Sequence, residues 1–115
     1  MRKLMFGVFV FILFLTDAIA QNKGKEIFEQ KGCVLCHKVD SAGIGPSLHK
    51  ISKAYLGKGA ELLSYLKSQG KPIVEPKRAA VMNPQLIKIK ILSDEDMKSL
   101  ATYIVSSADT PLYNK

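Results

Sequence analysis

The residues with the most distinctive chemistry are two cysteines and a histidine that lie within five positions of one another. They are Cys33, Cys36 and His37, with Val34 and Leu35 between the cysteines, in the pattern C-x-x-C-H. This spacing is typical of c-type haem attachment: two thiols on one side of the chain add to the two vinyl groups of one porphyrin, and the adjoining histidine binds the iron. We therefore predict one covalently bound haem c, attached through Cys33 and Cys36, with His37 as the proximal iron ligand.

Three other chemistries use closely spaced cysteines, and each fits this sequence less well. A thioredoxin-like C-x-x-C site needs an α/β framework, whereas this chain has no strand pattern. A structural zinc site needs four ligands. Only Cys33, Cys36, His37 and His49 are available, and the adjacent Cys36 and His37 are poorly placed to serve one tetrahedral ion. A Cys33–Cys36 disulfide suits an exported protein, but it leaves His37 without a role.

The second axial position of the iron has two candidate methionines in the predicted mature chain. Met97 lies in the apolar stripe of a predicted helix, where methionine usually fills the core. Met82 lies in a proline-rich loop between Pro76 and Pro84, and such a rigid loop can hold a weak ligand without a helix. We predict Met82 as the distal ligand, because methionine and histidine together form an established ligand pair of haem iron. His49 is an alternative donor, although a partly exposed histidine is the simpler interpretation.

The first twenty residues have the layout of a secretory signal peptide. A basic start precedes an apolar run over residues 4–15, and small residues lead to an expected cleavage between Ala20 and Gln21. An uncleaved membrane anchor is the alternative, but this run is shorter than the roughly 20 residues that a spanning helix needs. We assign residues 1–20 to a signal peptide and residues 21–115 to one domain, exported to the periplasm without stable membrane insertion.

The chain is basic, with 17 Lys and Arg, 10 Asp and Glu, and a formal net charge of +7. The charge is +6 once Arg2, Lys3 and Asp17 leave with the signal peptide. A basic balance suits nucleic acid, anionic lipid or an acidic protein partner. Export excludes nucleic acid as a sensible partner, and the lysines are spread along the chain. The candidate docking lysines are those that flank the attachment motif, Lys31, Lys38, Lys50 and Lys53.

The hydrophobic periodicity predicts an all-α fold. The clearest helix follows Ser93, which caps an acidic first turn, and its apolar residues recur at helical spacing. This stripe consists of Met97, Leu100, Ala101, Ile104 and Val105. Shorter helices are expected over residues 24–31, 48–55 and 60–68. Residues 40–46 are expected to form a loop, and residues 72–84 to be mostly irregular with one helical turn over residues 77–81. Only residues 86–92 could suggest a strand.

Four separated stretches together resemble the small bacterial class I cytochromes c over nearly all of residues 24–107. They are G-K-E-I-F-E-Q-K-G-C-V-L-C-H, I-G-P-S-L, V-M-N-P-Q-L and L-S-D-E-D-M-K-S-L-A-T-Y-I. The resemblance implies four to five short helices around one haem, with the first and last helices crossing. Gly24 and Phe28 would then pack against Leu100 and Tyr103.

The same resemblance implies roles for individual residues of the site. The carbonyl of Pro46 would accept a hydrogen bond from the ring nitrogen of His37 that does not face the iron, which fixes the tautomer of the ligand. The family methionine falls on Met82. The stretch from Ile73 to Val81 is longer than in the shortest members and suggests an added helical turn before the ligand.

The function that follows is that of a one-electron carrier. With His37 and Met82 both bound, the iron has no open position, so we expect a monomeric, soluble carrier that is not an enzyme. Its partners would be redox proteins such as a quinol–cytochrome c oxidoreductase and a terminal oxidase or reductase, in a respiratory or related chain. The alternative is a haem enzyme or gas-binding sensor with a displaceable distal ligand. A subunit retained by one oxidase complex is a third possibility.

Overall fold

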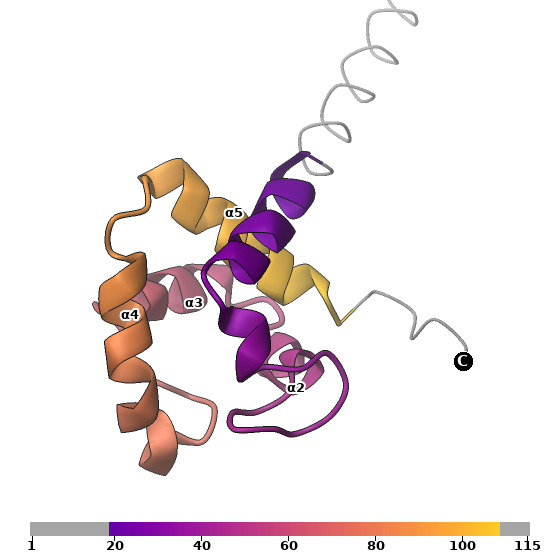
Figure 1. Cartoon of the computed structure of the whole chain (residues 1–115), viewed down its shortest axis with the longest axis vertical. Helices are drawn as coiled ribbons and strands as arrows, with labels where there is room; N and C mark the ends of the chain where they lie inside the picture. The colour runs from indigo at the N-terminus through magenta and orange to yellow at the C-terminus, as the bar shows by residue number, and fades with distance from the viewer. Residues whose placement is uncertain (1–18, 109–115) are drawn as a thin grey trace, which may run out of the picture.

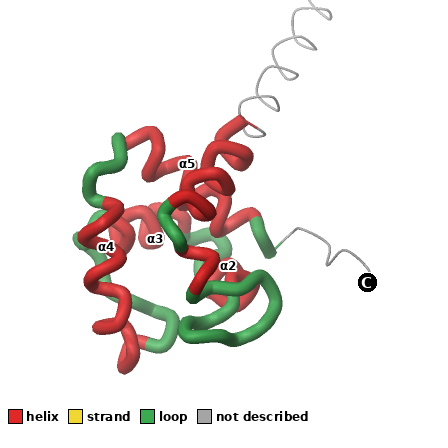
Figure 2. Tube along the Cα trace, in the orientation of Figure 1, coloured by secondary structure: helices red, strands yellow, loops and turns green. Residues whose placement is uncertain are grey.

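The computed structural model describes residues 19–108, and this part of the chain consists of helices joined by loops, with no strand (Figure 2). Residues 19–30 form a helix that we call the N-terminal helix. The elements that follow, with η for a 3-10 helix, are η1 (Cys33–Leu35), α2 (Leu48–Ala54), α3 (Gly59–Leu66), η2 (Pro76–Met82), α4 (Asn83–Ile89) and α5 (Asp94–Ser106). The predicted all-α fold is confirmed.

The predicted signal peptide, residues 1–20, lies outside the described residues except for its last two positions. Its cleavage therefore stays a prediction. Between residues 19 and 108, every helix is too short or too polar to span a bilayer.

Serine caps fix the starts of α2 and α5. The hydroxyl oxygen of Ser47 accepts a hydrogen bond from the backbone N–H of Lys50 at 3.1 Å, and that of Ser93 accepts one from Asp96 at 3.1 Å. Each cap satisfies a backbone N–H that has no partner within its helix. The first turn of α5 also carries three acidic residues, whose charge favours the positive end of the helix dipole. The start predicted for the last helix is confirmed.

The core forms around α5. This helix packs against α2 and α3, and the N-terminal helix crosses it (Figure 1). The buried face of α5 consists of Met97, Leu100, Ala101 and Ile104, while Val105, the last residue of the predicted stripe, is half-buried. Met97 is only 3% exposed, as expected of a methionine that fills the core.

The crossing of the N-terminal helix over α5 depends on a glycine. A Cβ atom at Gly24 would overlap the backbone oxygen of Ser99 and lie 2.6 Å from the Cβ of Tyr103. One turn further along the N-terminal helix, Phe28 meets Tyr103 edge to face, with ring centroids 5.5 Å apart at an interplanar angle of 63°, a favoured aromatic geometry. These contacts of Gly24 and Phe28 with Tyr103 are those that the resemblance implied.

The other end of α5 is joined to α2 through Ser52. The side chain of Ser52 is completely buried, and its hydroxyl donates a hydrogen bond to the carbonyl of Val105 and accepts one from the backbone N–H of Ala108. Both polar functions of this buried group are therefore satisfied, as native cores require.

The largest departure from the sequence prediction lies in residues 72–92. Residues 72–84 were expected to be mostly irregular, but residues 76–82 form η2 and α4 begins directly after it. The turn expected over residues 77–81 lies within η2, and residues 86–92, which could suggest a strand, are the second half of α4 followed by a turn. Pro76 and Pro84 stand in the first turns of these two helices. A proline there loses no helical hydrogen bond, so these prolines start helices rather than prevent them.

Candidate haem-binding site

The C-x-x-C-H motif forms a tight turn directly after the N-terminal helix. Gly32 precedes this turn with φ 75°, a left-handed conformation that glycine adopts without strain. The backbone N–H groups of Cys36 and His37 both donate to the carbonyl of Cys33, at 3.2 Å and 2.9 Å. The two thiols are not joined in a disulfide, and both line the same cavity. The turn therefore presents two free thiols and a histidine to one space.

The cavity has a volume of about 280 Å³ and is lined chiefly by apolar side chains. Side chains that also belong to the core form its deep wall. These residues are Phe28, Tyr55, Leu62, Leu66, Ile89, Leu100 and Ile104. A cofactor held here would therefore contact the same residues that pack the helices together.

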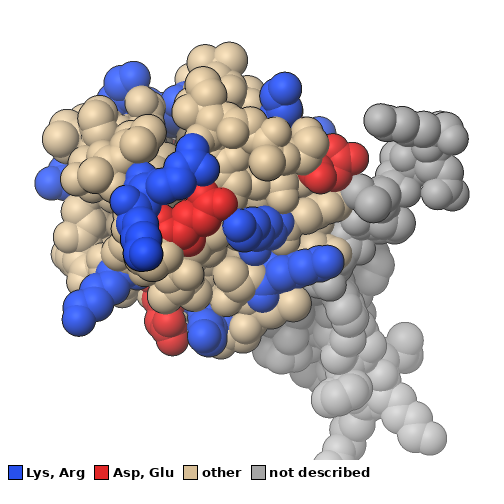
Figure 3. All heavy atoms as spheres, turned by 90° about the horizontal axis from the view of Figure 1, so that it is seen from below, with Lys and Arg blue, Asp and Glu red and all other residues tan. Residues whose placement is uncertain are grey.

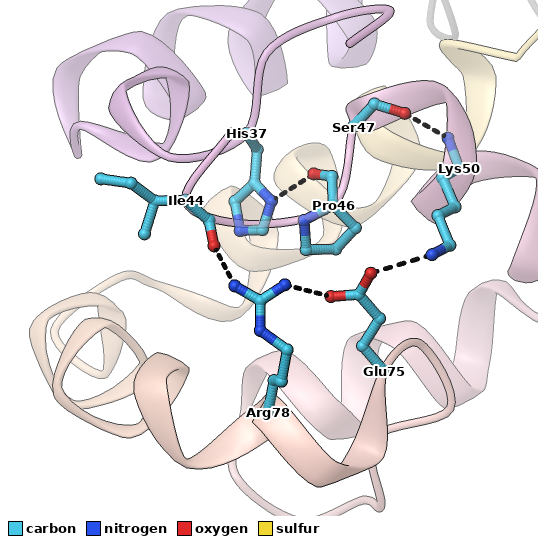
Figure 4. A network of polar contacts seen from close by, with 7 residues as sticks. All are labelled: His37, Ile44, Pro46, Ser47, Lys50, Glu75 and Arg78. Atoms are coloured by element: carbon cyan, nitrogen blue, oxygen red, sulfur yellow. Dashed lines mark hydrogen bonds and ion pairs between the residues drawn. The ribbon is translucent and has the colours of Figure 1, made fainter. Parts of the chain in front are cut away.

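His37 is oriented by the loop that follows it. The ring is 7% exposed, and its Nδ1 lies 2.8 Å from the carbonyl oxygen of Pro46 (Figure 4). Because a carbonyl only accepts, Nδ1 carries the hydrogen and donates it, which leaves the lone pair on Nε2. That Nε2 faces the sulfur of Met82 at 3.4 Å. An imidazole nitrogen and a thioether sulfur, from residues 45 positions apart, thus converge on one point of the cavity.

Gly45 makes the approach of this loop to His37 possible. A Cβ atom at Gly45 would lie 2.6 Å from Cε1 and 2.9 Å from Nδ1 of the His37 ring. The sequence prediction treated Gly45 only as part of a loop. The sequence did not predict the contact of Gly45 with His37, because the neighbouring Pro46 indicates only that the chain forms a loop there.

We expect Gly45→Ala to displace the His37 ring and weaken its hydrogen bond to Pro46. Overpacking of this kind costs about 1–3 kcal/mol, so thermal unfolding of the purified protein should shift to lower temperature. Gly43→Ala is the control, since its Cβ would have its nearest neighbour, the carbonyl oxygen of Cys36, at 3.4 Å. Equal behaviour of the two variants would contradict the role of Gly45.

The pKa of the Cys33 thiol differs in direction from that of a redox-active dithiol. Burial raises the pKa of the Cys33 thiol above its ordinary value, and a backbone hydrogen bond offsets only part of this effect. Reactive thiols of the thioredoxin type have a lowered pKa, since the thiolate is the nucleophile. The environment of Cys33 therefore does not suit disulfide exchange.

The structure brings Cys33, Cys36, His37 and Met82 to one cavity. Met82 was expected in an irregular loop, but it is the last residue of η2 and directly precedes α4. The helical backbone on both sides, which the prolines favour, explains the difference. His49 does not line the cavity. Its Nε2 is buried and has no hydrogen-bond partner among the described residues.

The chain belongs to the cytochrome c family, whose model matches residues 21–108. Curated relatives agree with this assignment. The chain is 32% identical over 92 residues to cytochrome c-551 of Pseudomonas denitrificans, a match that covers 74% of this chain and 98% of the relative. It is 29% identical over 85 residues to cytochrome c-551 of Pseudomonas aeruginosa, covering 70% and 72% of the two chains. A shorter match, 41% identical over 34 residues, is to cytochrome c-551 of Azotobacter vinelandii.

Membership of this family implies a covalently bound haem c, and the cavity fits it. Two free thiols lie three positions apart beside a buried histidine. The lone-pair nitrogen of that histidine lies 3.4 Å from a thioether sulfur in the cavity lining, and the remaining lining is mostly apolar. The chain is therefore a c-type cytochrome.

Proposed function

We propose that this chain is an exported carrier of single electrons with a six-coordinate haem. Cys33 and Cys36 form the two thioether bonds, His37 is the proximal ligand and Met82 is the distal ligand. The observation that carries this proposal is the alignment of His37 Nε2 with the sulfur of Met82 at 3.4 Å inside the cavity. When bound, the haem supplies an iron that gains or loses one electron.

The residues around the iron set its preference for the reduced state. The thioether of Met82 favours ferrous iron, so a methionine–histidine pair raises the reduction potential. The apolar lining acts in the same direction, because it penalises the extra charge of ferric iron. The hydrogen bond from His37 to Pro46 holds the ring in one orientation in both states. If His37 and Met82 both held the iron, substrates would have no access to the metal, so we propose a carrier and not an enzyme.

Electrons would cross at an edge of the cavity that is open to solvent. Three apolar side chains that line the cavity are also strongly exposed: Leu35 at 76%, Ile44 at 63% and Val81 at 62%. Exposed apolar side chains around an opening are typical of an interaction site. A small patch of this kind suits a weak, short-lived contact with a redox partner.

Basic residues around this opening would direct the approach of partners. Lys31, Arg78 and Lys88 contribute to the cavity lining, and Lys and Arg outnumber acidic residues on the face drawn in Figure 3. Charges of one sign steer an oppositely charged partner. Of the four docking lysines proposed from the sequence, only Lys31 lines the cavity. The partners we propose are acidic faces of redox proteins, such as a quinol–cytochrome c oxidoreductase and a terminal oxidase or reductase.

We place this carrier in the periplasm as a monomer after removal of residues 1–20. The cytochrome c family match begins at residue 21, directly after the predicted cleavage point, which supports that division. Purification tests the location: a free carrier should be recovered from the soluble periplasmic fraction, beginning at Gln21. Recovery only with a membrane oxidase would instead indicate a bound subunit.

Met82→Ala tests the ligand assignment. We expect loss of the weak long-wavelength charge-transfer band of ferric methionine-ligated haem, and binding of carbon monoxide by the ferrous protein. Axial ligands tune haem potentials over about 0.8 V, and we expect a decrease on the order of 0.1 V or more in the Met82→Ala protein. Ferrous protein of this variant that stays inert to carbon monoxide would refute the assignment.

Met97→Leu is the matched control for this substitution. Met97 is buried in the core, and exchange of Met for Leu nearly conserves volume, so the spectrum should be unchanged. A spectral loss in this variant would mean that the wrong methionine was chosen. A parent protein that lacks the band and binds carbon monoxide would instead support the haem enzyme or gas sensor.

A further inference from the structure

Polar contacts link two walls of the cavity at its mouth. The carboxylate of Glu75 accepts hydrogen bonds from Lys50 at 2.9 Å and from Arg78 at 3.2 Å, and a second nitrogen of Arg78 donates to the carbonyl of Ile44 at 2.8 Å. Figure 4 shows these contacts as one chain of interactions. We call this set, Lys50, Glu75, Arg78 and the Ile44 carbonyl, the ionic clasp.

The two ends of the ionic clasp belong to the segments that carry the proposed iron ligands. Ile44 lies two residues before Pro46, which holds the His37 ring. Arg78 lies in η2, the helix whose last residue is Met82. The guanidinium of Arg78 therefore joins the loop beside His37 to the helix that ends at Met82.

The helix that carries Met82 needs such support. A 3-10 helix has poor hydrogen-bond geometry and rarely exceeds four residues, yet η2 has seven. The N-cap residue before it is Glu75, whose φ of 47° and ψ of 57° are left-handed. A residue other than glycine keeps that conformation only where its surroundings compensate. The side chain of Glu75 pairs with two cations, Lys50 and Arg78, so the ionic clasp lies where the backbone takes this conformation.

The ionic clasp is too exposed to contribute much to global stability. The side chains of Lys50 and Arg78 are 58% and 60% exposed, and ion pairs in water gain little free energy. Its effect should therefore be local, on the position of η2 and of the residue at its end.

We propose that Arg78 is a positioning residue for the distal iron ligand, an inference that rests on the proposed ligation by Met82. By holding η2 against the loop of Ile44, Arg78 lowers the fraction of molecules in which the sulfur has left the iron. That fraction sets the apparent affinity for any external ligand that competes with Met82.

The test measures binding of imidazole to the ferric protein. Arg78→Ala should bind imidazole about three to ten times more tightly than the parent, with a weaker long-wavelength band. Arg78→Lys should behave like Arg78→Ala, because one ammonium group does not reproduce the guanidinium fork that reaches both Glu75 and Ile44. The thermal midpoint should change little, which separates positioning from a general loss of structure.

A double-mutant cycle shows whether Arg78 acts through Met82. In a Met82→Ala background, Arg78→Ala should leave the imidazole affinity unchanged, since no sulfur remains to be positioned. Lys77→Ala is the matched control: it removes a neighbouring positive charge that makes no hydrogen bond or ion pair with the described residues, and it should bind imidazole as the parent does.

The possible outcomes separate this proposal from the proposed ligation. Suppose that the parent shows the methionine band and that Arg78→Ala binds imidazole with the same affinity as the parent. That result would overturn the role of Arg78 and leave Met82 as the ligand. An effect of the same size in the Met82→Ala background, or in Lys77→Ala, would also overturn it. A parent without the band would refute both the ligation and the inference built on it.

Discussion

Replacement of both Cys33 and Cys36 by alanine is expected to give a colourless protein that does not fold. The apolar residues that line the cavity are also members of the core. A domain of this size buries only around two-thirds of the surface its unfolded chain exposes, so a large cofactor forms a substantial part of its interior. Without covalent attachment, the cofactor would be free to leave the protein.

Two measurements check this prediction on protein exported by a host that matures c-type haem. A pyridine haemochrome spectrum of the parent should show that both vinyl groups are consumed, and the double variant should show no covalent haem. Circular dichroism should show that most of the helical signal is lost. Leu35→Ala is the control, because Leu35 lies between the two cysteines but is 76% exposed. A double variant with parental helix content and thermal midpoint would contradict the account of the core.

Gly24→Ala is expected to cause the largest loss of stability from a single methyl group. The added carbon would overlap the backbone oxygen of Ser99 and lie 2.6 Å from the Cβ of Tyr103. Because both neighbours belong to a packed helix, the two helices must move apart. Overpacking costs about 1–3 kcal/mol, and each kcal/mol shifts the midpoint of a domain this small by roughly 4–8 °C. We expect the upper part of that range.

Gly59→Ala is the matched control for this substitution. Gly59 is the first residue of α3, and a Cβ atom there would meet nothing within 4 Å. Alanine has a higher helix propensity than glycine by about 1 kcal/mol, so this variant should be as stable as the parent or slightly more stable. Thermal unfolding of the two variants side by side gives the comparison. A Gly24→Ala protein as stable as Gly59→Ala would show that the helices do not cross at Gly24.

The features that the sequence predicts correctly depend on neighbours along the chain. The cap at Ser93 and the apolar stripe that follows it are local patterns, and they give the start and the buried face of α5. The C-x-x-C-H motif is local in the same sense, since its cysteines and histidine share one turn. Such features follow from short-range geometry, which is identical wherever the pattern occurs.

The features that the sequence does not predict depend on residues far apart or on backbone atoms. The bond from Arg78 to Ile44 spans 34 positions and ends on a carbonyl, which every residue possesses, so no residue type marks the acceptor. The contact of Gly45 with His37 likewise depends on how the loop turns back. The prolines of η2 and α4 show a third difficulty, because a proline that begins a helix and one that prevents a helix look alike in sequence.

The distance along the sequence between His37 and Met82 has a consequence for how this protein unfolds. His37 adjoins Cys36, so in denaturant it stays next to the cofactor even when the rest of the chain is random coil. Met82 lies 45 positions further on. Bringing it back beside His37 during refolding costs the entropy of closing that loop. If Met82 binds the iron as proposed, the visible absorption of that bond would serve as an optical reporter of tertiary structure, and it should vanish in the same transition that separates the two halves of the chain.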